Sequence, residues 1–209
     1  MIAILDYGVG NLFSLSSSLS HLGIENKITH SAAEIAAAHR IILPGVGAFG
    51  DAMAKLEATG LVPVLQSAVQ SGTPLLGICL GMQLLFDESA EYGTHQGLGF
   101  IRGSVQPLAG ALQSIGAAYK VPHMGWNALD ISQKDSPLMK YTHSGDCVYF
   151  VHSFYATNCA PALVATAEYG VAVPACVANG NVYGCQFHPE KSGAAGLAIL
   201  RAFNEIDRG

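Results

Sequence analysis

The chain has 209 residues, of which half are apolar and 12% are charged, and its formal net charge is −5. This size and composition predict a single domain over residues 1–209 with a sizeable core. The ten Lys and Arg residues form no run, which argues against nucleic acid or an anionic membrane as the main partner. No apolar stretch reaches the roughly 18 residues that span a bilayer.

The start, MIAILDYG, has no features of a signal peptide and predicts a first strand. The five cysteines are odd in number and include no C-x-x-C pair. They fit a reducing cytoplasm and indicate neither a disulfide framework nor a zinc site. Cysteines other than Cys79 are expected in the core.

The first 90 residues predict strands alternating with helices. Helices are expected at 12–22, in the Ala-rich stretch after a capping box of Ser31 and Glu34, at 52–71 with a break near Gly60 and Pro63, and from residue 80 onward. Buried strands are expected between them at 1–6, 24–30, 40–43 and 73–78. This alternation predicts parallel strands with helices on both faces. Further on, turns separate short strands at 99–105, 147–156, 162–169, 174–180 and 181–187, which predicts antiparallel additions before a last helix at 193–206.

Residues 77–81 read Gly-Ile-Cys-Leu-Gly, at the junction of an expected strand and helix. The spacing matches a nucleophile elbow, in which the two glycines relieve crowding around a strained residue, here Cys79. The helix that follows would aim its N–H groups at the sulfur and favour the thiolate. The N–H of Leu80 could also donate to an oxyanion. A buried cysteine in a glycine-rich turn is the alternative.

A thiolate needs a base, and the segment QFHPEKS offers one. Residues i and i+2 of an extended segment point to the same side, so Glu190 can orient the imidazole of His188. Pro189 lacks an N–H, which places the segment at the end or edge of a strand. Cys79, His188 and Glu190 are therefore the candidate nucleophile, base and orienting residue. A surface His-Pro-Glu turn is the alternative.

The loop PGVG, residues 44–47, ends the third expected strand. Open α/β sheets place their sites at the carboxyl ends of the strands, so this loop should lie beside the elbow. Val46 or Gly47 is the expected second oxyanion donor, and the flanking glycines would ease a peptide flip. An ordinary turn is the alternative. A dinucleotide-binding fingerprint at residues 8–13 fails because Phe13 occupies its third glycine position.

Together, GICLGMQLLF and QFHPEKS resemble the class I (triad) glutamine amidotransferases. Within this class the chain is similar over its whole length to the glutaminase subunits of imidazole glycerol phosphate synthase, from histidine biosynthesis. The segments DYGVGNL, LPGVGAFGDAM, GLGFIRG, VPHMGWN and YFVHSFYA carry this closer similarity. The resemblance implies a flavodoxin-like α/β fold, with a mixed, mostly parallel sheet flanked by helices.

The resemblance also implies a reaction without cofactor or metal. The thiolate attacks the side-chain amide of glutamine, ammonia leaves, and water hydrolyses the glutamyl thioester to glutamate. The ammonia passes to a (β/α)8 cyclase subunit, the partner in a heterodimer. By resemblance, glutamine is held by Gly47, Gln83, Glu91, His152, Ser153 and Phe154, and the cyclase faces Asn11, His123, Trp126, Tyr149 and Lys191. For Trp126 and Lys191 the alternatives are core packing and a solvated side chain.

The sequence leaves two other functions open. One is another cysteine hydrolase on the same scaffold, such as a peptidase-like or gamma-glutamyl hydrolase relative. The other is a non-catalytic binding module in which Cys79 is inert. Glutamine turnover that rises with a cyclase partner separates the first from the amidotransferase, and the absence of any glutamate release favours the second.

Overall fold

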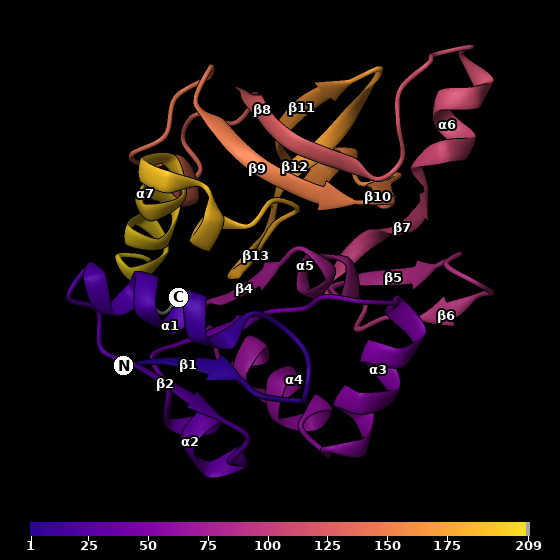
Figure 1. Ribbon diagram of the computed structural model, residues 1–209. Coiled ribbons are helices and arrows are strands. Elements are labelled where there is room, and N and C mark those ends of the chain that lie inside the picture. The colour runs from indigo at the N-terminus through magenta and orange to yellow at the C-terminus, as the bar shows by residue number, and fades with distance from the viewer. Residues whose placement is uncertain (208–209) are drawn as a thin grey trace.

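The computed structural model describes residues 1–207 and shows two β-sheets with helices packed around them (Figure 1). Within these residues the main sheet has nine strands in the order β2-β1-β3-β4-β13-β12-β11-β8-β9, and a smaller sheet has four in the order β10-β7-β5-β6. The strands are β1 Ile2–Leu5, β2 Asn26–Thr29, β3 Arg40–Leu43, β4 Leu75–Ile78, β5 Phe86–Ser89, β6 His95–Gln96, β7 Ile101–Pro107, β8 His123–Ile131, β9 Cys147–His152, β10 Phe154–Thr157, β11 Leu163–Tyr169, β12 Val171–Asn179 and β13 Val182–Cys185.

The main sheet is mixed, as expected. Strands β2, β1, β3, β4 and β13 run parallel to one another. Strands β12, β11, β8 and β9 continue the sheet in antiparallel order. The loop 44–47, the elbow and the segment holding His188 follow β3, β4 and β13, so neighbouring parallel strands deliver all three to one edge of the sheet.

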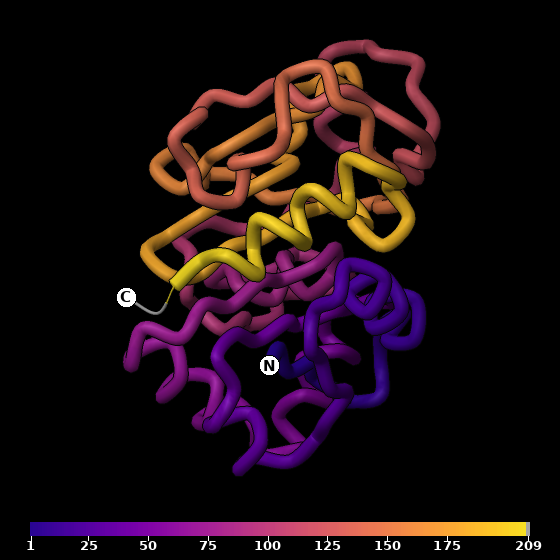
Figure 2. Tube along the Cα trace, turned by 90° about the vertical axis from the view of Figure 1, so that its left-hand side faces the viewer, coloured from indigo at the N-terminus to yellow at the C-terminus, as the bar shows by residue number. Residues whose placement is uncertain are grey.

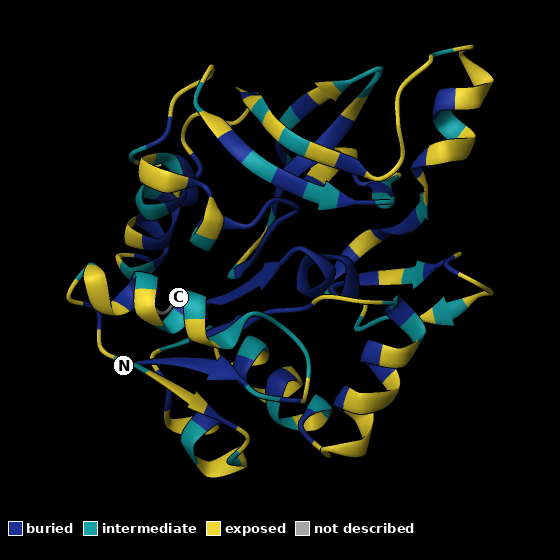
Figure 3. Ribbon diagram, in the orientation of Figure 1, coloured by how far each residue is buried: buried dark blue, intermediate teal, exposed yellow. Residues whose placement is uncertain are grey.

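Helices cover both faces of the parallel strands. The helices in the described residues are α1 Leu12–His21, α2 Ala32–Ala37, α3 Phe49–Ala58, α4 Val62–Gln70, α5 Leu80–Leu84, α6 Leu108–Ser114 and α7 Gly193–Asn204, with 3₁₀ turns η1 Pro137–Met139, η2 Ala160–Ala162 and η3 Pro189–Lys191. Helix α6 instead packs Leu108 and Leu112 against Val173 of the antiparallel strand β12. Along β1, Ile2 and Ile4 share a core with α1 and α7, whereas Ala3 and Leu5 share one with α2, α3 and α4. This double coverage explains why β1 and β4 are apolar throughout and wholly buried (Figure 3).

Helix α7 joins the two halves of the main sheet. It contacts α1 beside the parallel strands and β9 in the antiparallel part, and Figure 2 shows it lying along the boundary between them. Ile199, Leu200 and Phe203 of α7 are fully buried in the same core as Phe150 of β9. The antiparallel extension is thus held against the strands that carry the elbow.

Several segments differ from the expectations. Helix α5 ends at Leu84, and Phe86 already belongs to β5, because Phe86 pairs with Ile101 in the smaller sheet. The expected strand 147–156 is divided at Ser153 into β9 of the main sheet and β10 of the smaller one. Strand β8 and helix α6 were not expected. None of the helices in residues 1–207 has the length and apolar character needed to cross a membrane.

Candidate active site

The turn between β4 and α5 has the geometry of a nucleophile elbow. Cys79 adopts φ 54° and ψ −111°, a strained conformation for a residue with a side chain. A Cβ atom on Gly77 would lie 2.6 Å from the carbonyl oxygen of Gly81, and one on Gly81 would overlap the carbonyl oxygen of Leu43. The glycines therefore let the start of α5 press against β3 and β4, which confirms the expected elbow.

The Cys79 side chain is held at the floor of a cavity. Its Sγ lies 3.9 Å from the carbonyl oxygen of Val151 and 3.9 Å from Nε2 of Gln186. The backbone N–H of Cys79 donates to the carbonyl oxygen of Cys185 at 2.8 Å, which ties the elbow to β13. The sulfur thus sits at the edge of the sheet, where α5 begins.

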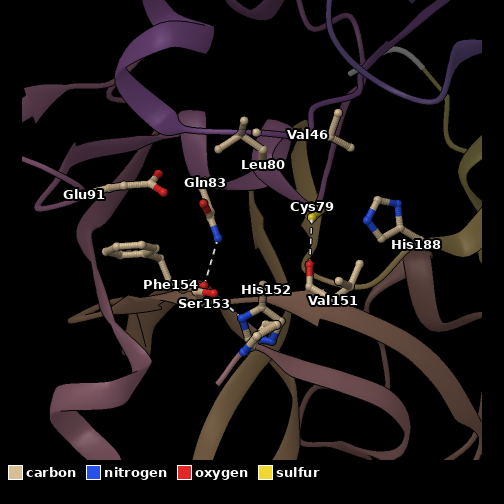
Figure 4. Close-up of a pocket in the computed structure, with 12 residues that line it drawn as sticks. Val46, Cys79, Leu80, Gln83, Glu91, Val151, His152, Ser153, Phe154 and His188 are labelled. Carbon is tan, nitrogen blue, oxygen red and sulfur yellow. Dashed lines mark hydrogen bonds between the residues drawn. The ribbon is translucent and has the colours of Figure 1, made fainter. Parts of the chain in front are cut away.

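His188 and Glu190 form a buried pair next to this sulfur (Figure 4 shows the ring beside Cys79). Nδ1 of His188 lies 2.9 Å from Oε1 of Glu190, and both side chains are 3% exposed. Burial by itself lowers the pKa of His188, but hydrogen bonds to Cys79 and Glu190, together with their charges, raise that pKa to about 9. The structure therefore brings all three candidate catalytic residues together, with His188 able to keep a proton at neutral pH.

A cavity of about 340 Å³ opens in front of Cys79 (Figure 4). Its lining contains all three candidate oxyanion residues and all the residues suggested for glutamine binding: Val46, Gly47, Leu80, Gln83, Glu91, His152, Ser153 and Phe154. Val151 and Pro122 also line it and were not singled out in the sequence. Alternation along β9 could have indicated Val151, whereas no local pattern marks Pro122.

Two polar side chains stand at the far end of the cavity from His188 (Figure 4). Oε2 of Glu91 accepts a hydrogen bond of 2.7 Å from the backbone N–H of Phe49, at the start of α3, while burial raises the pKa of this carboxyl. Nε2 of Gln83 donates to the carbonyl oxygen of Phe154 at 2.9 Å and lies 3.0 Å from Oε1 of Gln186. A carboxylate in this position can receive an ammonium group.

The loop 44–47 lies against the start of α5, as expected. A Cβ atom on Gly45 would lie only 2.6 Å from the backbone nitrogen of Gly81. Gly47 has φ +98°, a conformation that favours glycine. Val46 and Gly47 line the cavity beside Leu80, so both sides of the proposed oxyanion hole border the same space.

The residues suggested for the partner surface fall into two groups. Trp126 is 56% exposed, which rules out core packing, and its ring lies 6.0 Å from that of Tyr149. Lys191 is exposed and Asn11 is partly exposed. The expectation that His123 faces the partner is corrected, because its side chain is fully buried and stacked on Phe150 and Tyr169.

The cysteines also need one correction. Cys159, Cys176 and Cys185 are buried, as expected, but Cys147 is exposed at the start of β9. Among residues 1–207 no group of three or more His, Cys, Asp or Glu side chains is arranged to hold a metal ion.

Comparison with known proteins decides the family. Residues 3–205 match the family described as "Glutamine amidotransferase class-I". The chain belongs to this family. As a class-I glutamine amidotransferase it is an enzyme, which sets aside the interpretation as an inert binding module. The mixed sheet and the strand-to-helix elbow agree with the fold that this family implies.

Curated relatives match the chain over its full length. The imidazole glycerol phosphate synthase subunit HisH of Geobacillus thermodenitrificans is 51% identical over 210 residues, covering 100% of this chain and 97% of the relative. The same subunit of Syntrophotalea carbinolica is 48% identical over 207 residues, covering 99% of this chain and 100% of the relative.

Solved structures support the fold. A glutamine amidotransferase superposes with a TM-score of 0.74 at 20% identity, covering 98% of this chain and 97% of the other. PurLQS from Thermotoga maritima superposes with a TM-score of 0.72 at 20% identity, covering 97% of this chain and 96% of the other. At this identity the likeness concerns the fold alone.

Proposed function

We propose that the chain is the glutaminase subunit of a cytoplasmic imidazole glycerol phosphate synthase, acting as a single domain over residues 1–209. It hydrolyses glutamine to glutamate and passes the ammonia to a cyclase subunit. The observation that carries the proposal is the Cys79–His188–Glu190 arrangement at one end of a cavity whose other end holds Glu91. Full-length relatives named HisH support the assignment to this synthase.

The triad geometry supports attack by a thiolate. Because its pKa is raised to about 9, His188 can hold a proton at neutral pH beside the Cys79 sulfur, the candidate nucleophile. The thiolate adds to the amide carbon of glutamine, and the tetrahedral intermediate collapses by breaking its C–N bond. His188 gives its proton to the departing nitrogen, which leaves as ammonia, and a glutamyl thioester remains.

The second half of the reaction returns the enzyme to its starting state. Neutral His188 removes a proton from water as the oxygen attacks the thioester carbon. The C–S bond then breaks, glutamate leaves, and the thiolate faces an imidazolium again. Glu190 holds Nδ1 of His188 throughout, so that the other ring nitrogen serves the reaction.

The developing oxyanion would lie between two backbone donors. One is the N–H of Leu80 at the start of α5, and the other comes from Val46 or Gly47 in the facing loop. Loss of one such donor costs about 10²–10³ in rate in other enzymes. A loop that presents a carbonyl instead of an N–H would therefore be enough to silence the free subunit.

The cavity walls suit the remaining groups of glutamine. We assign Glu91 to the α-amino group and the backbone of residues 152–154 to the carboxylate, with Gln83 bracing Phe154 from the other side. This orientation directs the side-chain amide toward Cys79 and the oxyanion donors.

The cyclase would dock on the exposed apolar side chains near the cavity. Phe13, Met124 and Trp126 are 80%, 60% and 56% exposed, and Tyr149 lies beside Trp126. Large apolar side chains of this kind carry most of the binding energy of an interface.

Trp126→Ala should therefore weaken association with the cyclase at least tenfold. Ile28→Ala, at the opposite edge of the main sheet, is the control that should leave association unchanged.

The decisive experiment for the function is a reconstitution. The chain, L-glutamine, a cyclase subunit and its nucleotide substrate should together yield imidazole glycerol phosphate and glutamate in equal amounts. A gamma-glutamyl hydrolase or peptidase would release its product without regard to the cyclase. Turnover of glutamine that never supplies the cyclase would refute the proposal.

A further inference from the structure

Two buried histidines connect the glutamine cavity to the outer strands of the main sheet. Nε2 of His152 lies 2.9 Å from Nδ1 of His123, and the rings are at 68° to each other. His123 is fully buried between the rings of Tyr169, at 3.9 Å, and Phe150, at 4.7 Å. Neither histidine has a role in the triad, yet His152 lines the cavity.

The far ends of this pair both meet oxygen atoms. Nδ1 of His152 lies 2.8 Å from the carbonyl oxygen of Phe154, which can only accept a hydrogen bond. Nε2 of His123 lies 2.9 Å from Oδ1 of Asn127. The orientation of that amide is fixed because its Nδ2 donates to the carbonyl oxygen of Glu168 at 2.9 Å.

The chain of contacts therefore needs more protons than two neutral rings possess. It has three contacts, to Phe154, between the rings and to Asn127, and each requires one N–H hydrogen. A neutral imidazole carries one such hydrogen and an imidazolium carries two. Two neutral rings leave one contact with facing lone pairs, and a single added proton completes all three.

The surroundings keep the empty pair neutral. Burial lowers the pKa of both rings, and the pKa of His152 falls to about 4. Among the described residues, Tyr169 is stacked on His123, and its hydroxyl donates to the backbone carbonyl oxygen of Lys120. Cys79, Glu91 and His188 line the cavity together with His152, and the positive charge of His188 opposes a proton on His152. A negative charge entering the cavity would reverse this balance.

We propose that His123 is a positioning residue for glutamine and that the His123–His152 pair takes up one proton from solvent when glutamine enters the cavity. This inference rests on the proposed function, because it needs the α-carboxylate of glutamine beside residues 152–154 while Glu91 receives the α-ammonium group. The added proton completes the hydrogen bond from His152 to the Phe154 carbonyl, which Gln83 contacts from the other side. The wall of the cavity is thereby fixed and positively charged only while glutamine is bound.

Coupled uptake of one proton has a measurable consequence. Glutamine affinity should fall by about tenfold per pH unit between the pKa of the pair in the empty protein and its higher pKa in the glutamine complex. His123→Phe preserves the ring stack but leaves His152 with one hydrogen to place, so a neutral ring suffices. Asn127→Leu keeps both rings and removes the third acceptor, which also removes the need for the proton.

The test measures proton uptake directly. L-Glutamine binding to Cys79→Ala protein is followed by calorimetry in two buffers of different ionisation enthalpy. The control is Asn179→Leu, which likewise removes an asparagine that donates to a backbone carbonyl on the surface, here that of Phe100. About one proton should be taken up by the Cys79→Ala protein and by its Asn179→Leu form, and none by its Asn127→Leu or His123→Phe form.

Uptake that is absent in the Cys79→Ala protein, or that persists in Asn127→Leu, overturns the proposal. Ring ¹⁵N resonances give a second measurement that needs no substrate. In the empty protein one proton should titrate jointly on His123 and His152 with a common midpoint, and separate midpoints would overturn the pairing. If glutamine fails to bind while the joint titration is seen, the proposed function is wrong, whereas the shared proton of His123 and His152 still stands.

Discussion

The phenol of Tyr7 donates a hydrogen bond of 2.7 Å to the carbonyl oxygen of Pro44, the first residue of the loop 44–47. Tyr7 is buried, and burial together with the nearby charge of Cys79 raises its pKa, so it remains a donor. A Cβ atom on Gly10 would lie 3.0 Å from Cβ of Pro44. The amino-terminal segment DYGVG therefore holds the loop 44–47 in place through one hydrogen bond and close packing on Pro44.

The hydrogen bond from Tyr7 to Pro44 predicts an effect of Tyr7→Phe on catalysis. The variant leaves the Pro44 carbonyl without its partner, at a cost of about 1 kcal/mol in stability. A looser loop 44–47 should lower kcat several-fold in the complex while KM changes little. Tyr183→Phe, a buried tyrosine that packs on Phe203, is the control and should keep its kcat. Equal kcat values for the two variants would contradict the role of Tyr7.

The loop itself can be tested at Gly47. Gly47 has φ +98° and open space around its Cα, so Gly47→Pro forces a different backbone without a side-chain clash. We expect this variant to bind the cyclase normally but to lose most of the stimulation by the cyclase ligand. Gly60→Ala, at φ +69° with equally open space in a distant turn, controls for a side chain at a glycine of positive φ. Gly45 is unsuitable, because any side chain there would strike Gly81. Full stimulation in Gly47→Pro would rule out a switching loop.

The role of Cys79 as nucleophile can be tested by substitution and by thiol labelling, the latter in protein that lacks the exposed Cys147. Cys79→Ala and Cys79→Ser should abolish glutamine hydrolysis while ammonium salts still support the cyclase, because the fold and the partner surface are intact. Iodoacetamide should label Cys79 in Cys147→Ser protein, where the exposed competitor is absent. Glutamine-dependent activity in Cys79→Ala would disprove the assignment.

The pH dependence follows from the raised pKa of His188. Its folded-state pKa of about 9 exceeds the ordinary 6.5, so its contribution to stability is complete below about pH 6.5 and is lost as pH rises through about 9. Glutaminase activity should fall on the same alkaline limb, since the proton for ammonia is then missing.

Glu190→Ala separates the orienting role from proton transfer. The variant should shift the alkaline limb to lower pH, because Glu190 helps to hold the proton on His188. It should cost less activity than His188→Ala, which removes acid and base together and should cost several orders of magnitude. Equal losses in both variants would give the carboxylate a larger part in the chemistry.

The candidate triad could be predicted from the sequence because each of its two segments has a local pattern. Two glycines flank Cys79 at fixed spacing, and His188 and Glu190 lie two residues apart. The neighbouring parallel strands β4 and β13 then bring the two segments together, which the alternation of strands and helices could only suggest.

Other parts of the site depend on contacts that no spacing reveals. His123 and Trp126 belong to one short segment, yet the first is buried and the second exposed, because β8 lies near the edge of the sheet and alternates between its faces. The hydrogen bond from Tyr7 to Pro44 joins residues 37 positions apart. The division of 147–156 at Ser153 arises because β10 pairs with β7 in the smaller sheet.

The most direct test of the account is the rate of glutamate release from L-glutamine, measured for the chain alone and for its complex with the cyclase subunit and the cyclase nucleotide ligand. We predict near silence for the free chain and a rise of at least about 10²-fold in the liganded complex, the size expected when one oxyanion donor is gained. Equal rates in the two states, or no glutamate in either, would contradict it.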